Sequence, residues 1–381
     1  MQKILILGST GSVGVSSLKI ISQNKDLFDV RGLAAFSNEK LIIKQSKKFK
    51  NAKIYLENPK NKNYSDKKIS REALYELISS SEVDTVIAAI SGSDGLELTY
   101  HSIISGKKVL VANKEPLVMA GEFLIDLAKK NNSTIIPIDS EHCSIHQIIN
   151  NRDIQSVSKI TLTCSGGPFY SLPKSKFKKI SLREALRHPI WKMGKKISID
   201  SSTLMNKALE IIEAKYLFEI DQKKIDAIIH PEGIVHSLVA LTDGTVLASL
   251  AKPDMQIPIL YGLGFPETMI NKTNRIDIQK LSNLTFKNIN KDKFPSIDYA
   301  YFAINHGLGM PIVLNAANEI AVQSFMNGEI LFEDIFKVIS KTLDYAVKNN
   351  LKLKTVSLES ILSFNHEIKE ITSNNLKTFI K

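Results

Sequence analysis

Two carboxylates, Asp139 and Glu141, stand two residues apart directly after the apolar run 134–138. The run is rich in β-branched residues, which is typical of a short buried strand. Residues i and i+2 of an extended backbone project to the same face, so we expect the two side chains to converge. A divalent cation relieves the repulsion between paired carboxylates and prefers oxygen ligands. The pair therefore predicts part of a metal site, with a solvated loop as the simpler alternative.

A third ligand can be sought in residues 201–213. The apolar pattern predicts a helix over 203–218, for which Ser201 or Ser202 is a natural N-cap. Polar side chains recur on one face of this helix, at i, i+4 and i+7. Such a face is usually exposed to solvent, but the apolar residues around it leave little of this helix free for water. These polar residues are Asn206, Glu210 and Glu213, with Lys207 beside them.

Two loops could bind and enclose a substrate. Ser165 precedes two glycines after an apolar run, so a hydroxyl and free backbone amides could face an anion, with an ordinary turn as the alternative. Residues 188–195 contain the only Trp of the chain, and this composition suits either a lid that excludes water or a core anchor in a long loop. His230 and His236 lie near the ends of expected strands, and their spacing does not decide between core, metal and substrate roles.

A nucleotide site is indicated near the N-terminus. An apolar run over 3–7, a Gly-rich turn and an amphipathic pattern over 15–27 predict strand, turn and helix. Glycines in this turn, spaced Gly-x-x-Gly-x-x-Gly, would let a pyrophosphate approach the helix N-terminus. The next strand, 30–35, runs into Phe36-Ser37-Asn38 without a carboxylate for a ribose hydroxyl, so we expect NADP rather than NAD. The three glycines are Gly8, Gly11 and Gly14.

Strands and helices alternate through the first part of the chain, which predicts a doubly wound parallel sheet over about 1–140. The expected strands cover 3–7, 30–35, 53–56, 85–90, 108–112 and 134–138, with helices at 40–48, 71–79, 95–105 and 121–130. Longer strands of a second sheet are expected at 160–164, 227–229, 235–241 and 245–250. Residues 266–298 read as an extended connection, and 299–381 as mostly helical with a break at 307–309.

Composition excludes several classes of protein. The chain has 381 residues, 43% of them hydrophobic and 23% charged, which is typical of a soluble protein of two or three domains. No apolar run is long enough to span a membrane, and the start lacks a signal peptide, so we expect a cytoplasmic protein. Cys143 and Cys164 are too few for a disulfide framework or a cysteine zinc site. The net charge is +11, yet only 6 of 50 basic residues are Arg, so we expect anionic small substrates rather than nucleic acid.

Together these motifs resemble the 1-deoxy-D-xylulose 5-phosphate reductoisomerase family over nearly the whole chain. The matching residues are 7–14, 112–115, 139–142, 165–169, 188–189, 191, 193–194, 196–198, 200–201, 205–207, 209–210, 229–231, 236–237, 252–255 and 314–319. The resemblance implies an α/β Rossmann-like NADPH-binding domain over 1–140 and an α+β catalytic domain with a metal site and a lid over 141–265. It further implies a connecting segment over 266–298, a C-terminal helical domain over 299–381, and a homodimer without nucleic-acid or membrane partners.

The resemblance also implies a reaction. Deoxyxylulose 5-phosphate would rearrange to a branched aldehyde phosphate, by a retro-aldol/aldol or an α-ketol route. Hydride reduction by NADPH would then give 2-C-methyl-D-erythritol 4-phosphate, in non-mevalonate isoprenoid biosynthesis. Mg²⁺ or Mn²⁺, with Co²⁺ as a further candidate, would chelate the substrate carbonyl and hydroxyl.

Site residues follow from the resemblance by motif. The implied metal ligands are Asp139, Glu141 and Glu210. The implied catalytic residues are Lys114, Glu141, Glu213, His188, Trp191, Met193 and His236, with Glu213 as a second-layer or proton-transfer carboxylate. The implied substrate-binding residues are Lys114, Ser140, Ser165, His188, Ser201, Asn206 and Lys207. The implied cofactor-binding residues are Gly8, Ser9, Thr10, Gly11, Ser12, Val13, Ser37, Asn38, Asn113, Lys114, Glu115, Gly194 and Met255.

Departures from the family pattern are few. Pro116 stands where the family carries Ser, which could change local backbone hydrogen bonds, and Phe36-Ser37 replaces a small or basic residue beside the adenosine phosphate. Two other readings compete. A semialdehyde or homoserine dehydrogenase would also join a Rossmann half to a mixed domain, and a semialdehyde enzyme would need Cys143 or Cys164 as its nucleophile. A dinucleotide sensor without chemistry would not need the carboxylates and Lys207 together.

Overall fold

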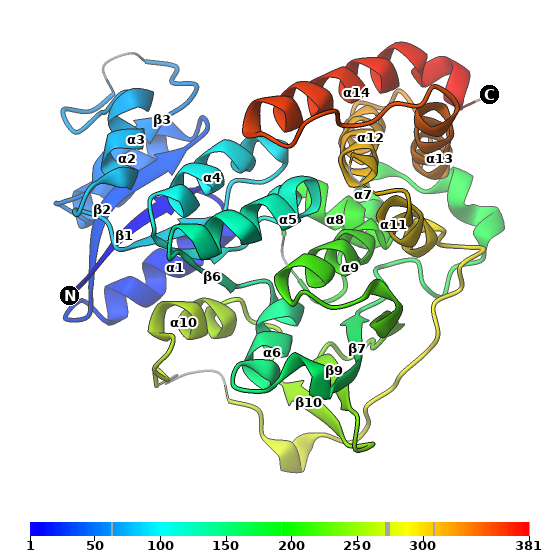
Figure 1. The fold of residues 1–381 in the computed structure, drawn as a ribbon, viewed down its shortest axis with the longest axis horizontal. Helices are drawn as coiled ribbons and strands as arrows, with labels where there is room; N and C mark the ends of the chain where they lie inside the picture. Colours follow the sequence, from blue (N-terminus) through cyan, green and yellow to red (C-terminus); the bar gives the residue numbers. More distant parts are fainter. Residues whose placement is uncertain (62–63, 192, 271–274, 308, 381) are drawn as a thin grey trace. The chain divides into compact units, whose positions relative to one another are not determined.

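The computed structural model describes residues 1–61, 64–191, 193–270, 275–307 and 309–380 (Figure 1). The chain forms two compact units whose segments interleave along the sequence. Unit 1 comprises Met1–Pro116, Glu122–His146 and Asp254–Arg275, and unit 2 comprises Leu117–Gly121, Gln147–Pro253 and Ile276–Lys381. The four-domain division expected from the sequence stays a prediction.

Unit 1 contains a six-stranded, all-parallel sheet in the order β3-β2-β1-β4-β5-β6, as the alternating pattern predicts. Neighbouring residues of β1 belong to different hydrophobic clusters: Ile4 and Ile6 to one, Leu5 and Leu7 to the other. Because successive strand residues point to opposite faces, both faces of this sheet are covered. The strands are β1 (Gln2–Leu7), β2 (Phe28–Ala35), β3 (Lys53–Leu56), β4 (Thr85–Ala88), β5 (Lys108–Val111) and β6 (Thr134–Pro137).

Except for α6, which was not predicted, the following helices of unit 1 lie close to their predicted positions. They are α1 (Ser12–Gln23), α2 (Glu39–Lys48), α3 (Arg71–Ser79), α4 (Leu96–Ile104), α5 (Glu115–Lys130) and α6 (Ser140–Ile149), with a 3-10 turn η1 (Ser93–Gly95). The sequence predicted neither α6 nor a further helix, α10 (Gln256–Gly264), which packs on the cluster that contains Ile138. Gly262 permits this packing, because a Cβ atom there would lie 2.7 Å from the Ile138 side chain.

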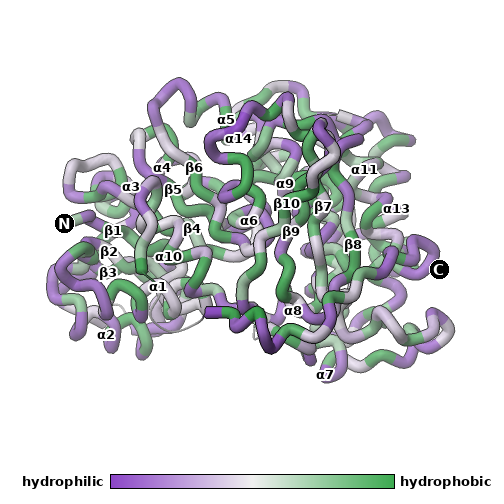
Figure 2. The backbone as a smooth tube through the Cα atoms, turned by 90° about the horizontal axis from the view of Figure 1, so that it is seen from below, coloured by the Kyte–Doolittle hydropathy of each residue, from purple (hydrophilic) through white to green (hydrophobic). Residues whose placement is uncertain are grey.

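Unit 2 contains a mixed four-stranded sheet in the order β10-β9-β7-β8. The central strand β7 pairs in parallel with β8 and antiparallel with β9. All four strands had been expected, with slightly different ends, and Figure 2 shows hydrophobic segments along β7 and β9. The strands are β7 (Val157–Cys164), β8 (Ile225–Ile229), β9 (Val235–Leu241) and β10 (Val246–Leu250).

The remaining helices of unit 2 include the expected helical C-terminal part, in which α14 packs against α12 (Figure 1). The helices are α7 (Leu182–Ala185), α8 (Lys195–Ser202), α9 (Met205–Leu217), α11 (Ser296–Asn305), α12 (Met310–Met326), α13 (Asp334–Lys348) and α14 (Leu358–Phe379). The 3-10 turns are η2 (Ile154–Ser156), η3 (Lys174–Lys179), η4 (Gln222–Lys224) and η5 (Ile278–Lys280).

The described residues of the segment 266–298 are mostly irregular up to α11, apart from η5 and short bridges such as that between Ile229 and Lys287. Of the predicted break at 307–309, Leu308 lies outside the described residues. Among the described residues, no helix is long and apolar enough to cross a lipid bilayer.

Candidate functional site

The Gly-rich turn of unit 1 has the geometry of an anion-binding loop. Gly8 has φ +88°, and a Cβ atom there would lie 2.3 Å from the Ala89 carbonyl oxygen. A Cβ atom on Gly14 would lie 2.4 Å from the Gly8 carbonyl oxygen, so both positions require glycine. Helix α1 starts at Ser12, and its N-cap residue, Gly11, provides no side-chain cap for the amides of the first turn. These amides are therefore available to a pyrophosphate.

Ser9 Oγ and Asn113 Oδ1 are among the buried polar atoms of unit 1 that lack a hydrogen-bond partner among the described residues. The amide of Asn113 is held in place by its Nδ2 group, which donates to the Gly92 carbonyl over 3.0 Å. Buried polar groups normally have partners, so unpaired atoms of this kind indicate a missing ligand. Both residues were predicted to bind the cofactor, and a dinucleotide carries the donors and acceptors that they need.

Residues of the loop after β2 line a shallow hollow. It is lined by Ser37, Asn38, Glu39, Lys40, Ile43, Lys60 and Asn61. The side chain of Asn38 also caps α2, because its Oδ1 atom accepts the Leu41 amide over 3.2 Å. Phe36, one of the departures from the family pattern, is 62% exposed beside this loop. The hydroxyl, amide and ammonium groups suit a phosphorylated ribose, as the sequence indicates.

Asp139 and Glu141 lie at the start of a helix and not on an extended strand. Strand β6 ends at Pro137 and α6 begins at Ser140, so the extended i, i+2 geometry expected for the pair is wrong. Asp139 caps the helix, since its Oδ1 atom accepts the Glu141 amide over 3.3 Å. The positive end of the helix dipole favours both carboxylates. The hydroxyl of Ser140 donates to the Glu141 carboxylate.

Lys114 joins this group, because its ammonium forms an ion pair with Asp139 inside unit 1. Lys114 occupies the N-cap position of α5, and Glu115 is the buried first residue of the helix. Pro116 follows in the first helical turn, where a residue without an amide proton costs no intrahelical hydrogen bond. The departure at Pro116 therefore fits the local backbone. Met255 lies at the N-cap position of α10.

In unit 2, the polar face of α9 is buried, so the solvent-exposed alternative is wrong. Glu210 is 0% exposed and accepts a hydrogen bond from Asn206 Nδ2 over 2.6 Å, while Lys207, 2% exposed, forms an ion pair with it. Glu213 is buried one turn further along. This i, i+4 contact is the one that the spacing predicts. A buried carboxylate beside an ammonium and an amide can exchange those partners for a hard cation.

The predicted N-cap of this helix is wrong. Ser201 and Ser202 are the last residues of α8, and Leu204 occupies the N-cap position of α9 with φ +58°. A left-handed conformation is unusual for Leu and costs energy that tertiary packing must repay. The result is a tight junction that places Ser201 one short turn before Asn206 and Lys207.

Ser165 follows β7 and begins a turn in which Gly166 and Gly167 have positive φ. A Cβ atom on Gly167 would lie 2.6 Å from the Ser201 carbonyl oxygen, so the turn packs directly on the end of α8. Ser165 Oγ lies 3.1 Å from His188 Nε2. Unit 2 thus brings Ser165, His188 and Ser201 close together.

In the expected lid, residues 188–191, 193 and 194 have no regular secondary structure, and Lys195 begins α8. His188 Nδ1 accepts the amide hydrogens of Ile190 and Trp191, over 3.1 and 2.8 Å. Trp191 and Met193 are partly buried and Gly194 is exposed at the start of α8, whereas Lys192 lies outside the described residues.

The structure shows different surroundings for His230 and His236, whose roles the spacing did not decide. His230 is fully buried, and its Nδ1 lies 2.9 Å from the Thr285 carbonyl while its Nε2 accepts the Ile234 amide. Both ring nitrogens thus bind backbone groups, and His230 tethers the connecting segment. His236 Nε2 lies 3.2 Å from the Ala251 carbonyl.

Asp200 was among the residues that match the family motifs but was given no role, and it is 1% exposed on α8. Lys196 pairs with it over 2.8 Å and Asn318 Nδ2 donates to it over 2.9 Å, which ties α8 to α12. The i, i+4 spacing of Lys196 and Asp200 was the available signal.

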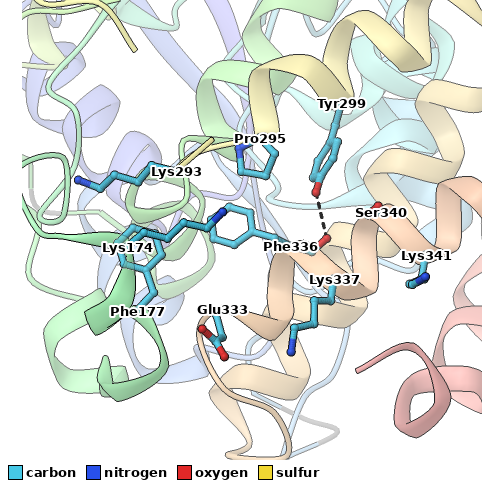
Figure 3. A pocket seen from close by; sticks show the side chains of 10 residues that line it. All are labelled: Lys174, Phe177, Lys293, Pro295, Tyr299, Glu333, Phe336, Lys337, Ser340 and Lys341. Atoms are coloured by element: carbon cyan, nitrogen blue, oxygen red, sulfur yellow. Dashed lines mark hydrogen bonds between the residues drawn. The ribbon is translucent and has the colours of Figure 1, made fainter. Parts of the chain in front are cut away.

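A separate hollow of about 350 Å³ lies between η3, α11 and α13 (Figure 3). Two of its lysines have partners: Lys293 donates to the Tyr170 carbonyl over 2.6 Å, and Lys337 pairs with Asp334 over 2.8 Å. The Tyr299 hydroxyl donates to the Phe336 carbonyl over 3.2 Å. None of the predicted site residues lines this hollow.

Three family models match the chain. Residues 4–121 match the model for 1-deoxy-D-xylulose 5-phosphate reductoisomerase, and residues 135–218 and 250–371 match models for the C-terminal domains of that enzyme. Curated relatives with the same description include one from Endomicrobium trichonymphae, 40% identical over 95% of this chain and 96% of the relative. Another, from Thermoanaerobacter pseudethanolicus, is 40% identical over 97% and 98%.

Solved structures agree with these relatives. A crystal structure of DOX-P reductoisomerase in complex with NADPH, fosmidomycin and magnesium has a TM-score of 0.91 and 37% identity, covering 99% of this chain and 98% of that one. The 1-deoxy-D-xylulose 5-phosphate reductoisomerase from Zymomonas mobilis in complex with NADPH has a TM-score of 0.89 and 35% identity, covering 98% of both chains.

Proposed function

This chain belongs to the 1-deoxy-D-xylulose 5-phosphate reductoisomerase family, and from that membership we propose that it converts 1-deoxy-D-xylulose 5-phosphate to 2-C-methyl-D-erythritol 4-phosphate. It is an NADPH-dependent oxidoreductase that also uses a divalent cation, and it acts in non-mevalonate isoprenoid biosynthesis. The observation that carries this function is the buried group on α9, where an acidic residue for a cation stands next to an ammonium and an amide for a phosphate.

The proposed cation ligands are Asp139, Glu141 and Glu210, each of which offers a carboxylate oxygen. An all-oxygen set suits Mg²⁺ or Mn²⁺. The ammonium groups of Lys114 and Lys207 support the assignment, because they lie beside Asp139 and Glu210, where positive charge stabilises the carboxylates. When bound, the cation supplies Lewis-acid polarisation of the substrate carbonyl during the carbon rearrangement.

The proposed phosphate site lies in unit 2. Ser165, Ser201, Asn206 and Lys207 offer hydroxyl, amide and ammonium donors, which match the acceptor oxygens of a phosphate. In unit 1, Lys114 and Ser140 are proposed to bind the hydroxylated carbon chain.

The dinucleotide is proposed to bind along the carboxyl edge of the parallel sheet, where it supplies the hydride for the reduction. The loop 8–13 would hold the pyrophosphate, and Asn113 would use its unpaired carbonyl. Ser37 and Asn38, with Lys40 or Lys60 nearby, would hold the phosphorylated ribose. Glu115, Gly194 and Met255 complete the proposed cofactor set.

Four further residues are proposed to act in catalysis. Glu213 is buried one turn after Glu210 and is suited to hold or transfer a proton. Trp191 and Met193 would exclude water, and His236 would support the site. Family membership argues against the two competing hypotheses, a semialdehyde or homoserine dehydrogenase and a dinucleotide sensor without chemistry. Cys143 is also buried at 1% exposure, which does not suit a nucleophile.

We propose a cytoplasmic homodimer. The edge strand β10 supports the dimer, because Val246 is 57% exposed there and an unprotected apolar edge favours pairing with another chain. Light scattering of the purified protein should give twice the chain mass, and Val246→Glu should lower that mass. A wild-type monomer would refute the proposal.

The activity test uses purified protein, deoxyxylulose 5-phosphate, NADPH and Mg²⁺. NADPH absorbance should fall only when all components are present, and a chelator should stop the fall. A constant absorbance in the complete mixture would overturn the function. Glu122→Gln, which removes an exposed carboxylate on α5, is a control that should keep full activity.

A further inference from the structure

The two ring nitrogens of His188 have different partners. Nδ1 lies within hydrogen-bond distance of two backbone amides, those of Ile190 at 3.1 Å and Trp191 at 2.8 Å. Nε2 lies 3.1 Å from Ser165 Oγ. His188 thus connects the proposed phosphate site with the loop that carries Trp191.

These contacts fix the tautomer of the ring. A backbone amide can only donate, so Nδ1 must accept and carries no proton. The ring is then neutral, its single proton lies on Nε2, and Nε2 donates to Ser165 Oγ. Hydrogen-bond geometry therefore determines the direction of the contact between His188 and Ser165.

The direction of that contact determines what Ser165 can do. Ser165 Oγ also accepts the Gly167 amide over 3.2 Å, so both lone pairs of the hydroxyl are used. The hydroxyl hydrogen must point to a third group, and none of the described residues accepts it. Ser165 can therefore only donate toward a ligand.

We propose that His188 is a positioning residue that acts through Ser165 and Trp191. As the Nε2–H tautomer it makes the Ser165 hydroxyl a dedicated donor to the substrate phosphate, whose oxygens only accept hydrogen bonds. Through Nδ1 it holds the backbone at Trp191, so phosphate binding and the position of the Trp191 loop share one side chain. The inference rests on the proposed phosphate site and adds to it the orientation of one hydroxyl.

The two roles can be separated with a matched pair of variants. In His188→Asn, the side-chain oxygen takes the place of Nδ1, so the Ile190 and Trp191 amides keep their acceptor while Ser165 loses its donor. In His188→Gln, the side-chain NH₂ group takes the place of Nε2, so Ser165 keeps its donor while the two amides lose their acceptor.

Two readouts that need no turnover report the two roles. Inorganic phosphate is the probe for the anion site, with its dissociation constant measured by calorimetry. Intrinsic fluorescence reports the loop, because Trp191 is the only tryptophan in the chain. His188→Asn should weaken phosphate binding about fivefold to tenfold, the size of one hydrogen bond, and leave the emission maximum unchanged. His188→Gln should shift the emission and change phosphate affinity less than about twofold.

A double-mutant cycle tests whether His188 acts through Ser165. In a Ser165→Ala background, His188→Asn should cause no further loss of phosphate affinity. Equal effects of Asn and Gln on both readouts, or additive effects of His188→Asn and Ser165→Ala, would overturn the inference. Thermal midpoints within about 3 °C of wild type ensure that a folded variant is measured. Absence of turnover in the wild-type protein would refute the proposed function. The phosphate-binding and fluorescence measurements would still test the role of His188, because they need no turnover.

Discussion

Glu210→Gln is the most informative single substitution in this chain. The substitution keeps the size of the side chain and keeps an oxygen that can accept the Asn206 hydrogen bond of 2.6 Å. It removes only the negative charge. Lys207, which is 2% exposed, then keeps a buried ammonium without the carboxylate that neutralises it.

The expected magnitude follows from this burial. Removing one partner of a buried ion pair costs about 3–5 kcal/mol of unfolding free energy, because the remaining charge is left uncompensated. Loss of a cation ligand removes several kcal/mol of transition-state stabilisation, and about 4 kcal/mol corresponds to roughly a thousandfold lower kcat. Nucleotide affinity should stay within about twofold, because the proposed dinucleotide residues lie almost entirely in unit 1.

The assay is urea unfolding followed by the fluorescence of Trp191, which lies in unit 2 like Glu210. The double variant Lys207→Met/Glu210→Gln removes both charges and should recover most of the lost stability while staying inactive. A single variant as stable as wild type, or a double variant less stable than the single one, would refute the buried-pair reasoning. Loss of NADPH binding together with turnover would indicate misfolding.

Three other predictions concern metal, glycine and pH. Mg²⁺ at about 100 times its dissociation constant should stabilise the wild-type protein by about 2.7 kcal/mol in urea titrations, and should not stabilise Glu210→Gln. Gly14→Ala should lower the thermal midpoint, because its Cβ would lie 2.4 Å from the Gly8 carbonyl oxygen, whereas Gly11→Ala, whose nearest atom is 3.4 Å away, should keep it. Burial lowers the pKa of His146 from 6.5 to about 4, so the unfolded chain binds the proton more readily and stability should fall as pH drops from about 6.5 to 4. The loss should approach at most about 3 kcal/mol and should be absent in His146→Gln, as measured by urea unfolding at pH 7 and pH 5.

The sequence was sufficient where local patterns and tertiary contacts agree. Alternating apolar runs and amphipathic helices predicted all six strands of the parallel sheet, because each strand is buried on both faces. The i, i+4 spacing on α9 likewise predicted the contact between Asn206 and Glu210. In these elements the side-chain period alone determines which residues meet.

The sequence was insufficient where backbone conformation depends on distant packing. Asp139 was expected on an extended backbone, but as a good N-cap it begins a helix at once. Ser201 is an equally good N-cap, yet it ends a helix, because the junction passes through a left-handed Leu204 that no propensity favours. Helix α10 was missed because it returns to unit 1 only after the strands and helices of unit 2 that follow α6, and because it packs through a glycine contact that spacing does not reveal.

The lysines that pair with the proposed cation ligands neutralise these carboxylates when no cation is bound. A carboxylate as buried as Glu210 would cost several kcal/mol without a compensating charge. Lys207 supplies that charge within the same turn of α9, and Lys114 does the same for Asp139 in unit 1. Both lysines are also proposed substrate ligands. A bound cation would neutralise the carboxylates in place of the ammonium groups, and the ammonium groups could then bind an anionic substrate. Cation and phosphate binding should therefore strengthen each other even for inorganic phosphate, which lacks the carbonyl and hydroxyl that chelate the cation, and titrations of phosphate with and without Mg²⁺ measure this coupling directly.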